Sequence, residues 1–275
     1  MGKFEGVLIC TDLDGTLLRD DKTISEENIE AIEYFKSEGG YFTFVTGRMP
    51  FFVSYASEKV KPNAPFGCIN GGGLFDSIKG EYVWKKVMTD SVTELIEYID
   101  KNLPEVGIQV NTFNKTYFCK ENNVMETFRK VTNAENIVCH YNDVKEPIAK
   151  ILFGSETEEE IKKLEKLLKE HPLSNDFSFT RSSRTLYEIL PKGIGKGTSI
   201  EKLCQHLMVD INKSIAIGDY NNDVSMFKVA GTGIAVSNAS TLALKEADYI
   251  TVSNEEHAIA KVISELDAGK YNILT

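Results

Sequence analysis

The chain has 275 residues and a formal net charge of -10, which disfavours nucleic acid and anionic membranes as partners. Its 42% hydrophobic and 26% charged residues indicate a globular protein with one large domain or two moderate ones, not a disordered chain. No apolar stretch reaches the roughly 18 to 20 residues that a membrane span needs.

The N-terminal part alternates strand-like and helix-like segments. Residues 7–10 form a short apolar run typical of a buried parallel strand. A helix is predicted to begin after the N-cap Ser25 and to end at Gly39-Gly40, and further strands are expected at 41–45 and 66–69. This strand–helix–strand order implies right-handed crossovers and a parallel sheet.

The C-terminal part shows the same alternation, and the middle differs. After residue 190 we predict helices at 197–207, 223–230, 239–247 and 255–266, with strands at 214–217, 233–236 and 249–252. The middle is predicted to hold helices at 90–103 and 124–131, a third opened by a capping box of Ser155 and Glu158, and strands at 107–112, 115–120, 148–153, 177–180 and 186–190.

This pattern predicts an α/β protein of two domains. Residues 1–82 and 190–275 are expected to build one doubly wound, Rossmann-like parallel sheet. Residues 83–189, with paired strands separated by helices, are expected to form an α+β domain inserted into the first.

The strongest chemical signal is Asp12-Leu13-Asp14-Gly15-Thr16, directly after the first strand. Ligands of parallel sheets bind beyond the carboxyl ends of the strands, where Asp12 lies. One acid of such a pair can serve as nucleophile or metal ligand while the other transfers protons. By itself the motif also fits a plain turn formed by Asp and Gly.

Other strand ends carry similar groups. The second strand leads into Thr46-Gly47-Arg48 and the third into Asn70-Gly71-Gly72-Gly73. The strand at 214–217 leads into Gly218-Asp219, with Asn222 and Asp223 one helical turn further on. Taken singly, these motifs also fit a strand-end turn, a flexible glycine loop and a helix cap.

Charge favours one combined site. If Asp12, Asp14, Asp219 and Asp223 converge, a phosphate faces repulsion of about 4 kcal/mol for each unit pair near 4 Å at an effective dielectric near 20. A divalent cation and Lys196, at the start of a predicted helix, offset that repulsion. Oxygen-only ligands without a Cys or His cluster favour Mg²⁺ as the cofactor.

In this order, the four motifs resemble those of the haloacid dehalogenase (HAD) superfamily of phosphatases, and the inserted middle segment resembles the cap of its Cof-type branch. The resemblance implies that Asp12 is the nucleophile, that Asp14 is the acid and base, and that Lys196 neutralises charge. It also implies Asp12, Asp14 (through its carbonyl) and Asp219 as Mg²⁺ ligands, with Asp223 orienting Lys196. The phosphate-binding groups expected at this site are Leu13, Thr46, Gly47, Arg48, Asn70, Gly71, Lys196 and Asn222.

The expected function is therefore Mg²⁺-dependent hydrolysis of small phosphorylated metabolites through an aspartyl-phosphate. Since its neighbours are anionic, Asp14 is expected to hold its proton more tightly than a free Asp. The alternatives are a phosphosugar mutase with the same chemistry, a phosphorylatable Mg²⁺-binding module and an inactive binding protein. Five scattered cysteines, none at a metal-binding spacing, fit a reducing compartment, so we expect a cytoplasmic protein.

Overall fold

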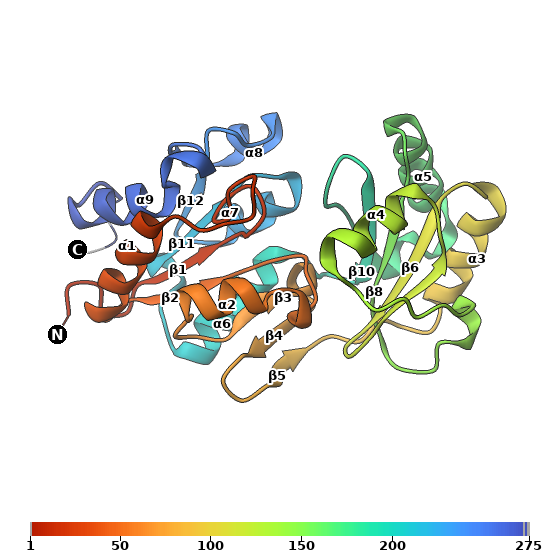
Figure 1. Ribbon diagram of the computed structural model, residues 1–275, viewed down its shortest axis with the longest axis horizontal. Coiled ribbons are helices and arrows are strands. Elements are labelled where there is room, and N and C mark those ends of the chain that lie inside the picture. The colour runs from red at the N-terminus through yellow and green to blue at the C-terminus, as the bar shows by residue number, and fades with distance from the viewer. Residues whose placement is uncertain (1, 272, 274–275) are drawn as a thin grey trace. The chain divides into compact units, whose positions relative to one another are not determined.

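The computed structural model describes residues 2–271 and 273 and shows two compact units (Figure 1). Unit 1 comprises Met1–Lys85 and Gly195–Thr275, and unit 2 comprises Lys86–Ile194. The junctions lie a few residues beyond the expected 82 and 190, because both of those positions fall inside continuous strands, β5 (Glu81–Lys85) and β10 (Leu186–Pro191).

Unit 1 contains a five-stranded parallel sheet in the order β13-β12-β11-β1-β2. Its strands are β1 (Leu8–Thr11), β2 (Tyr41–Phe44), β11 (Ser214–Gly218), β12 (Thr232–Ala235) and β13 (Tyr249–Ile250). In the centre, Leu8 of β1 pairs with Ser214 on one side and with Tyr41 on the other. The two ends of the chain thus build one sheet, and the predicted doubly wound core is confirmed.

Helices pack against this sheet. They are α1 (Glu26–Ser37), α2 (Ser54–Val60), α6 (Lys196–Leu207), α7 (Val224–Val229), α8 (Thr241–Glu246) and α9 (Ala258–Asp267). Leu8 and Cys10 share a hydrophobic cluster with residues of α6, α7 and α8. Because side chains alternate along a strand, Ile9 points to the opposite face, where it is also fully buried. Helices α1 and α9 lie side by side in Figure 1, and Asn28 of α1 accepts a hydrogen bond from the Ala260 amide of α9.

A small antiparallel sheet follows β2. It consists of β3 (Phe66–Cys68), β4 (Gly73–Asp76) and β5. The strand expected at 66–69 is β3, but it pairs antiparallel with β4 instead of joining the five-stranded parallel sheet. Strands β4 and β5 were not predicted; of the glycine run at 71–73, only Gly73 lies in β4. Helix α2 was also missed, since it has seven residues and only two of them, Ala56 and Val60, are buried.

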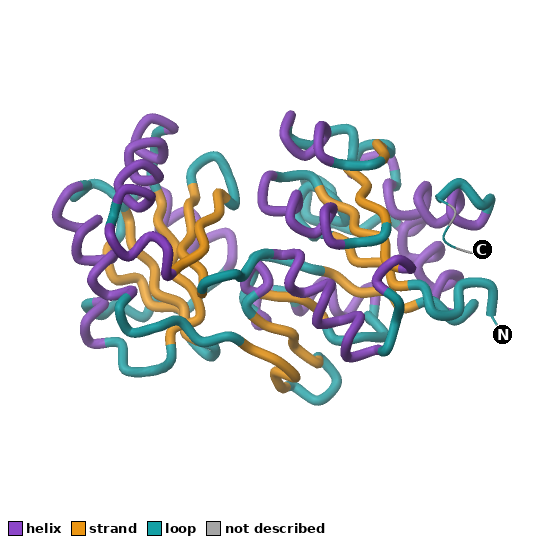
Figure 2. Tube along the Cα trace, turned by 180° about the vertical axis from the view of Figure 1, so that it is seen from behind, coloured by secondary structure: helices purple, strands orange, loops and turns teal. Residues whose placement is uncertain are grey.

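Unit 2 is an antiparallel sheet in the order β7-β6-β8-β10-β9, with three helices (Figure 2). Its remaining strands are β6 (Gly107–Thr112), β7 (Thr116–Lys120), β8 (Ile148–Gly154) and β9 (Phe177–Arg181), and its helices are α3 (Val92–Asn102), α4 (Asn123–Thr132) and α5 (Glu158–Glu170). Side chains from the sheet, α3 and α5 form its main hydrophobic core.

The predicted capping box of α5 was placed two residues too early. Thr157 is the N-cap, and its hydroxyl accepts the Glu160 amide. Ser155 instead hydrogen bonds the Glu160 carboxylate. None of the helices within residues 2–271 is long and apolar enough to cross a membrane.

Candidate active site

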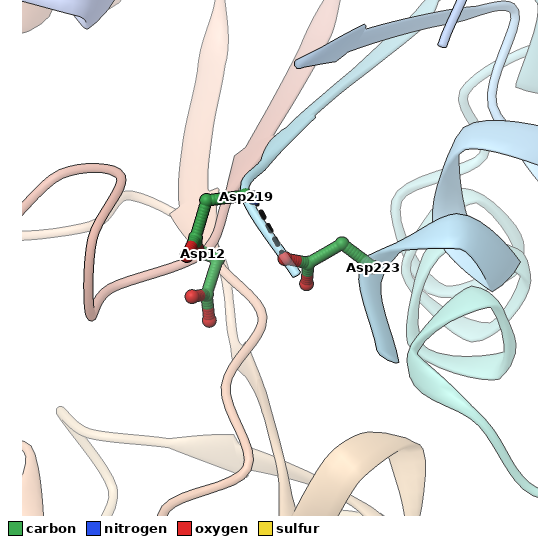
Figure 3. Close-up of side chains that lie close together, drawn as sticks. All are labelled: Asp12, Asp219 and Asp223. Carbon is green, nitrogen blue, oxygen red and sulfur yellow. Dashed lines mark hydrogen bonds between the residues drawn. The ribbon is translucent and has the colours of Figure 1, made fainter. Parts of the chain in front are cut away.

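Three carboxylates converge where two neighbouring parallel strands end. Asp12 follows β1, and Asp219 follows β11, the strand that pairs with β1. Asp223 comes one turn later, and oxygen atoms of the three side chains lie within 4.8 Å of one another (Figure 3). The sequence placed these acids at strand ends, and the parallel pairing brings the ends to one edge of the sheet.

Lys196 bridges two of these carboxylates. Its Nζ lies 2.6 Å from Asp12 Oδ1 and 2.5 Å from Asp223 Oδ1, and the side chain is 1% exposed. Lys196 begins α6, whose Gly197 packs so closely against α7 that a Cβ there would lie 2.4 Å from the Ser225 carbonyl oxygen. The close packing of these two helices fixes the ammonium between the two acids.

Both carboxylate oxygens of Asp223 accept hydrogen bonds from other groups of the protein. Its Oδ1 accepts from Lys196, and its Oδ2 accepts the Asp219 and Tyr220 amides, each at 2.8 Å. The dashed line in Figure 3 marks the first of these two amide bonds. Asp223 therefore holds both Lys196 and the Asp219 backbone, and both of its oxygens are engaged.

Asp12 and Asp219 remain as the groups suited to a divalent cation. Asp219 Oδ1 accepts from the Thr16 hydroxyl at 2.9 Å. Gly15 has φ +82°, and a Cβ at this position would lie 2.7 Å from Asp219 Oδ2, so the turn that carries Thr16 past Asp219 requires glycine. Carboxylate oxygens such as those of the buried Asp12 and the half-buried Asp219 fit Mg²⁺.

The charges of the cluster also favour a bound cation. Three carboxylates and one ammonium leave a surplus of two negative charges if all are ionised. Burial, together with the Asp223 charge, raises the pKa of Asp219 to about 6. Burial also raises the pKa of Asp12 well above its usual value, although Lys196 opposes this effect. The surplus charge would be compensated by a cation next to Asp12 and Asp219.

The Asp14 side chain is not part of this cluster, contrary to the expected crowding by anions. Arg48 Nε and Nη2 donate to its two oxygens at 2.8 and 2.7 Å, and Lys22 Nζ donates at 3.0 Å. Burial alone would raise the pKa of Asp14, but these two cations lower it below its usual value. The prediction of a tightly held proton was therefore wrong for this arrangement, because the nearest charges are positive. Ligation of a metal by the Asp14 carbonyl remains a prediction.

The remaining expected phosphate-binding residues fall into two groups. Thr46 and Asn70 are buried, and the backbone amide of Asn70 donates to the Thr46 carbonyl. Gly47 lies close to the same residue, since a Cβ at this position would be 3.0 Å from the side-chain amide of Asn70. Asn222 Nδ2 donates to Asn70 Oδ1 at 3.0 Å, while Asn70 Nδ2 and Asn222 Oδ1 are buried without a protein partner. These four residues thus connect the loops after β2, β3 and β11.

The other group includes Leu13, Gly71 and Arg48. Leu13 is fully buried, and its carbonyl accepts the Thr16 and Leu18 amides, which shapes the loop after Asp12. Gly71 has φ +96°, and a Cβ at this position would lie 1.8 Å from the Gly195 carbonyl oxygen, next to Lys196. Arg48 was expected to bind phosphate, but in this structure its guanidinium donates to both oxygens of Asp14.

Sequence reasoning missed two residues of the site. Thr16 was quoted in the first motif but given no role, although a hydroxyl four residues after Asp12 is a ready donor to a carboxylate. Lys22 had no local signal at all. It has φ +67° in the turn between Arg19 and Thr23, and only the folded loop shows that its ammonium reaches Asp14.

Comparison with known proteins shows the family. The sequence model of the haloacid dehalogenase-like hydrolase family matches residues 9–263 of this chain. A 5-amino-6-(5-phospho-D-ribitylamino)uracil phosphatase of Bacillus subtilis is 30% identical over 93% of this chain and 94% of its own. A haloacid dehalogenase-like hydrolase structure from Bacteroides thetaiotaomicron has a TM-score of 0.79 and 26% identity, covering 94% of this chain and 99% of that one.

A further solved structure, a HAD subclass IIB sugar phosphatase, shares the fold with a TM-score of 0.84 at 20% identity, covering 95% of this chain and 99% of that one. The resemblance inferred from the motifs is thereby confirmed. This protein belongs to the haloacid dehalogenase-like hydrolases and is an enzyme of that family.

Proposed function

We propose that this protein is a Mg²⁺-dependent phosphatase that hydrolyses small phosphorylated metabolites through an aspartyl-phosphate on Asp12. The observation that carries the proposal is the buried contact of 2.6 Å between Lys196 and Asp12, which follows β1 and lies next to Asp219. A lone buried carboxylate repels a phosphate, whereas one neutralised by an ammonium and a cation accepts it.

We assign two steps to this site. In the first, an Asp12 oxygen attacks phosphorus, the bond to the leaving oxygen breaks, and Asp14 gives that oxygen a proton. Because Arg48 and Lys22 lower the pKa of Asp14, this carboxyl group must give up one of its bonds to them when it carries that proton. In the second, water attacks phosphorus, Asp14 takes the proton, and the bond to Asp12 breaks. Lys196 holds Asp12 in one orientation through both steps, and Asp223 holds Lys196.

Asp12 and Asp219 would hold the metal, and the Thr16 hydroxyl would orient Asp219. When bound, Mg²⁺ supplies positive charge that offsets the negative charge of the phosphate and the two carboxylates. Asn70 and Asn222 offer a buried amide donor and a buried acceptor for the phosphoryl group or its attached alcohol.

The substrate class is proposed from the relatives. One similar protein is named for dephosphorylating a phosphoribitylamino-uracil, and a protein with the same fold is a sugar phosphatase. Both names describe phosphate on a polyhydroxylated carbon chain, so we propose a sugar phosphate or polyol phosphate as substrate. The five cysteines are free, which supports the cytoplasm as its compartment.

The direct test is release of inorganic phosphate from a panel of sugar, polyol and nucleoside phosphates, with Mg²⁺ and with EDTA. We expect metal-dependent release that EDTA abolishes and that added Mg²⁺ restores. A phosphosugar mutase would instead interconvert sugar phosphates and need a bisphosphate activator. A phosphorylatable module would form a stable phosphoprotein without turnover, and a protein inactive on the whole panel would contradict the proposal.

Metal binding is expected to change how stability depends on pH. The pKa of Asp219 is about 6 in the folded protein, above its ordinary 3.8, so the folded state binds more protons between these values. The contribution of this group to stability is therefore lost as pH rises through that window in EDTA. Because Mg²⁺ binds the ionised form, its stabilisation is expected to grow over the same range, reaching about 2.7 kcal/mol at 100 times its dissociation constant.

Thermal unfolding at pH 4.5 to 8, with and without Mg²⁺, measures this effect. Asp219→Asn is expected to lose most of the Mg²⁺ increment and to flatten the pH dependence. Asp90→Asn, at an exposed position of unit 2, serves as the matched control and is expected to keep both. An increment that is the same in Asp219→Asn as in wild type would place the metal elsewhere.

A further inference from the structure

Asp14 is held by cations from two different loops. The Arg48 guanidinium donates one hydrogen bond to each oxygen of Asp14, at 2.8 Å from Nε and 2.7 Å from Nη2. Lys22 adds a third bond, of 3.0 Å, to Asp14 Oδ1. Such two-point pairs of arginine and carboxylate fix orientation as well as charge, which a single lysine contact does not.

Arg48 is itself fixed in place. Its Nη1 donates to the Phe52 carbonyl at 2.9 Å, and its backbone amide donates to the Thr46 hydroxyl at 3.1 Å. Its carbonyl accepts the Ile69 amide at 3.1 Å, in a segment where Ile69 has φ +58° and Asn70 has φ +49°. Left-handed backbone at a β-branched residue is costly, and the surrounding structure must enforce it. The Arg48 backbone is therefore hydrogen bonded to a segment whose conformation the surrounding structure enforces.

We propose that Arg48 is a positioning residue for Asp14 rather than a ligand of the phosphate, an inference that rests on the proposed function. By holding the carboxylate, Arg48 sets where Asp14 faces the leaving oxygen and the attacking water. When Asp14 carries a proton, one of its three bonds to Arg48 and Lys22 is given up. Three of its N–H groups point to Asp14 and Phe52, so binding phosphate with the same fork requires giving up these bonds. Lys22, half-exposed and bonded through one contact, contributes less.

Substrates with different leaving groups can tell whether Arg48 positions Asp14 or binds phosphate. An alkoxide leaving group needs a proton as the bond to phosphorus breaks, whereas p-nitrophenolate leaves without one. A residue that positions the proton donor therefore affects alkyl phosphates selectively. A residue that binds phosphate affects both kinds of substrate and also the affinity for inorganic phosphate.

The experiment compares wild type, Arg48→Gln, Arg48→Lys and Asp14→Asn on glycerol phosphate and p-nitrophenyl phosphate, with inorganic phosphate as inhibitor. We expect Arg48→Gln to lower kcat/KM for glycerol phosphate by about 10²-fold, at the low end for general acid–base catalysis. For p-nitrophenyl phosphate, kcat/KM is expected to fall less than about threefold, because this parameter reports the first step and the leaving group needs no proton. The phosphate inhibition constant is also expected to stay within about threefold. Arg48→Lys keeps the positive charge but cannot make the two-point contact with Asp14. It is expected to lower kcat/KM for glycerol phosphate selectively too, but by a smaller factor than Arg48→Gln.

The double variant Asp14→Asn/Arg48→Gln is expected to be no slower than Asp14→Asn alone, because a positioning residue has nothing left to position. Arg129→Gln is the matched control, since Arg129 makes a similar two-point pair with Glu121 in unit 2, at 3.0 and 3.2 Å. Equal losses of kcat/KM on both substrates would overturn the inference, as would a tenfold weaker phosphate inhibition, full additivity in the double variant or no effect of Arg48→Gln. If Asp14→Asn lacks the selectivity, the proposed role of Asp14 fails instead.

Discussion

Asp12→Asn is expected to abolish turnover, lowering kcat by about 10⁴-fold or more, because an amide cannot attack phosphorus. The substitution keeps the size of the side chain and an oxygen that can accept from Lys196 Nζ, which lies 2.6 Å away. The loss therefore reports on the nucleophile and not on a rearranged site. Steady-state phosphate release with saturating Mg²⁺ measures it.

Trapping of the phosphoenzyme supplies a second readout for the same variant. Acid quenching during turnover is expected to leave a hydroxylamine-sensitive phosphoryl group on the peptide containing Asp12 in wild type and none in Asp12→Asn. Asp90→Asn is the control, at an exposed position outside the site, and is expected to retain activity. Turnover by Asp12→Asn near the wild-type rate would show that the nucleophile is another group or water.

Lys196→Met is expected to lose both activity and stability. Lys196 is 1% exposed and neutralises two buried carboxylates, and these two acids hold the pKa of the ammonium well above its usual value even though burial opposes this shift. Removing one partner of a buried ion pair typically costs about 3–5 kcal/mol, because a buried charge is left uncompensated. Urea unfolding at pH 7 in EDTA, together with phosphate release, measures the two effects.

A second substitution separates the two losses. In Lys196→Met/Asp223→Asn one of the uncompensated charges is removed, so part of the stability is expected to return while activity stays low. Lys150→Met in unit 2 is the matched control, because Lys150 is also buried and lies 2.9 Å from Glu188. It is expected to lose comparable stability and to keep turnover of p-nitrophenyl phosphate. Wild-type activity in Lys196→Met would exclude its assigned role.

The sequence by itself determined the class of the fold and the positions from which the site is built. Apolar runs at β1 and β11 predicted buried parallel strands, and polar groups followed directly after them. Asp12 and Asp219 were found in this way because strand ends in a parallel sheet are sites that periodicity and turn residues reveal locally. The strand at 66–69 was predicted, but its antiparallel pairing with β4 was not, because local periodicity does not show which strands pair.

The tertiary structure alone decided which charges meet. Asp14 and Asp12 are two residues apart, yet the three acids Asp12, Asp219 and Asp223 cluster while Asp14 pairs with Arg48 and Lys22. A pKa depends on charges within a few ångströms, and these come from loops that are distant in sequence, so the direction expected for Asp14 was wrong. Sequence patterns predict where a chemical group leaves its strand, but its charge state is set by long-range packing, which places the partners.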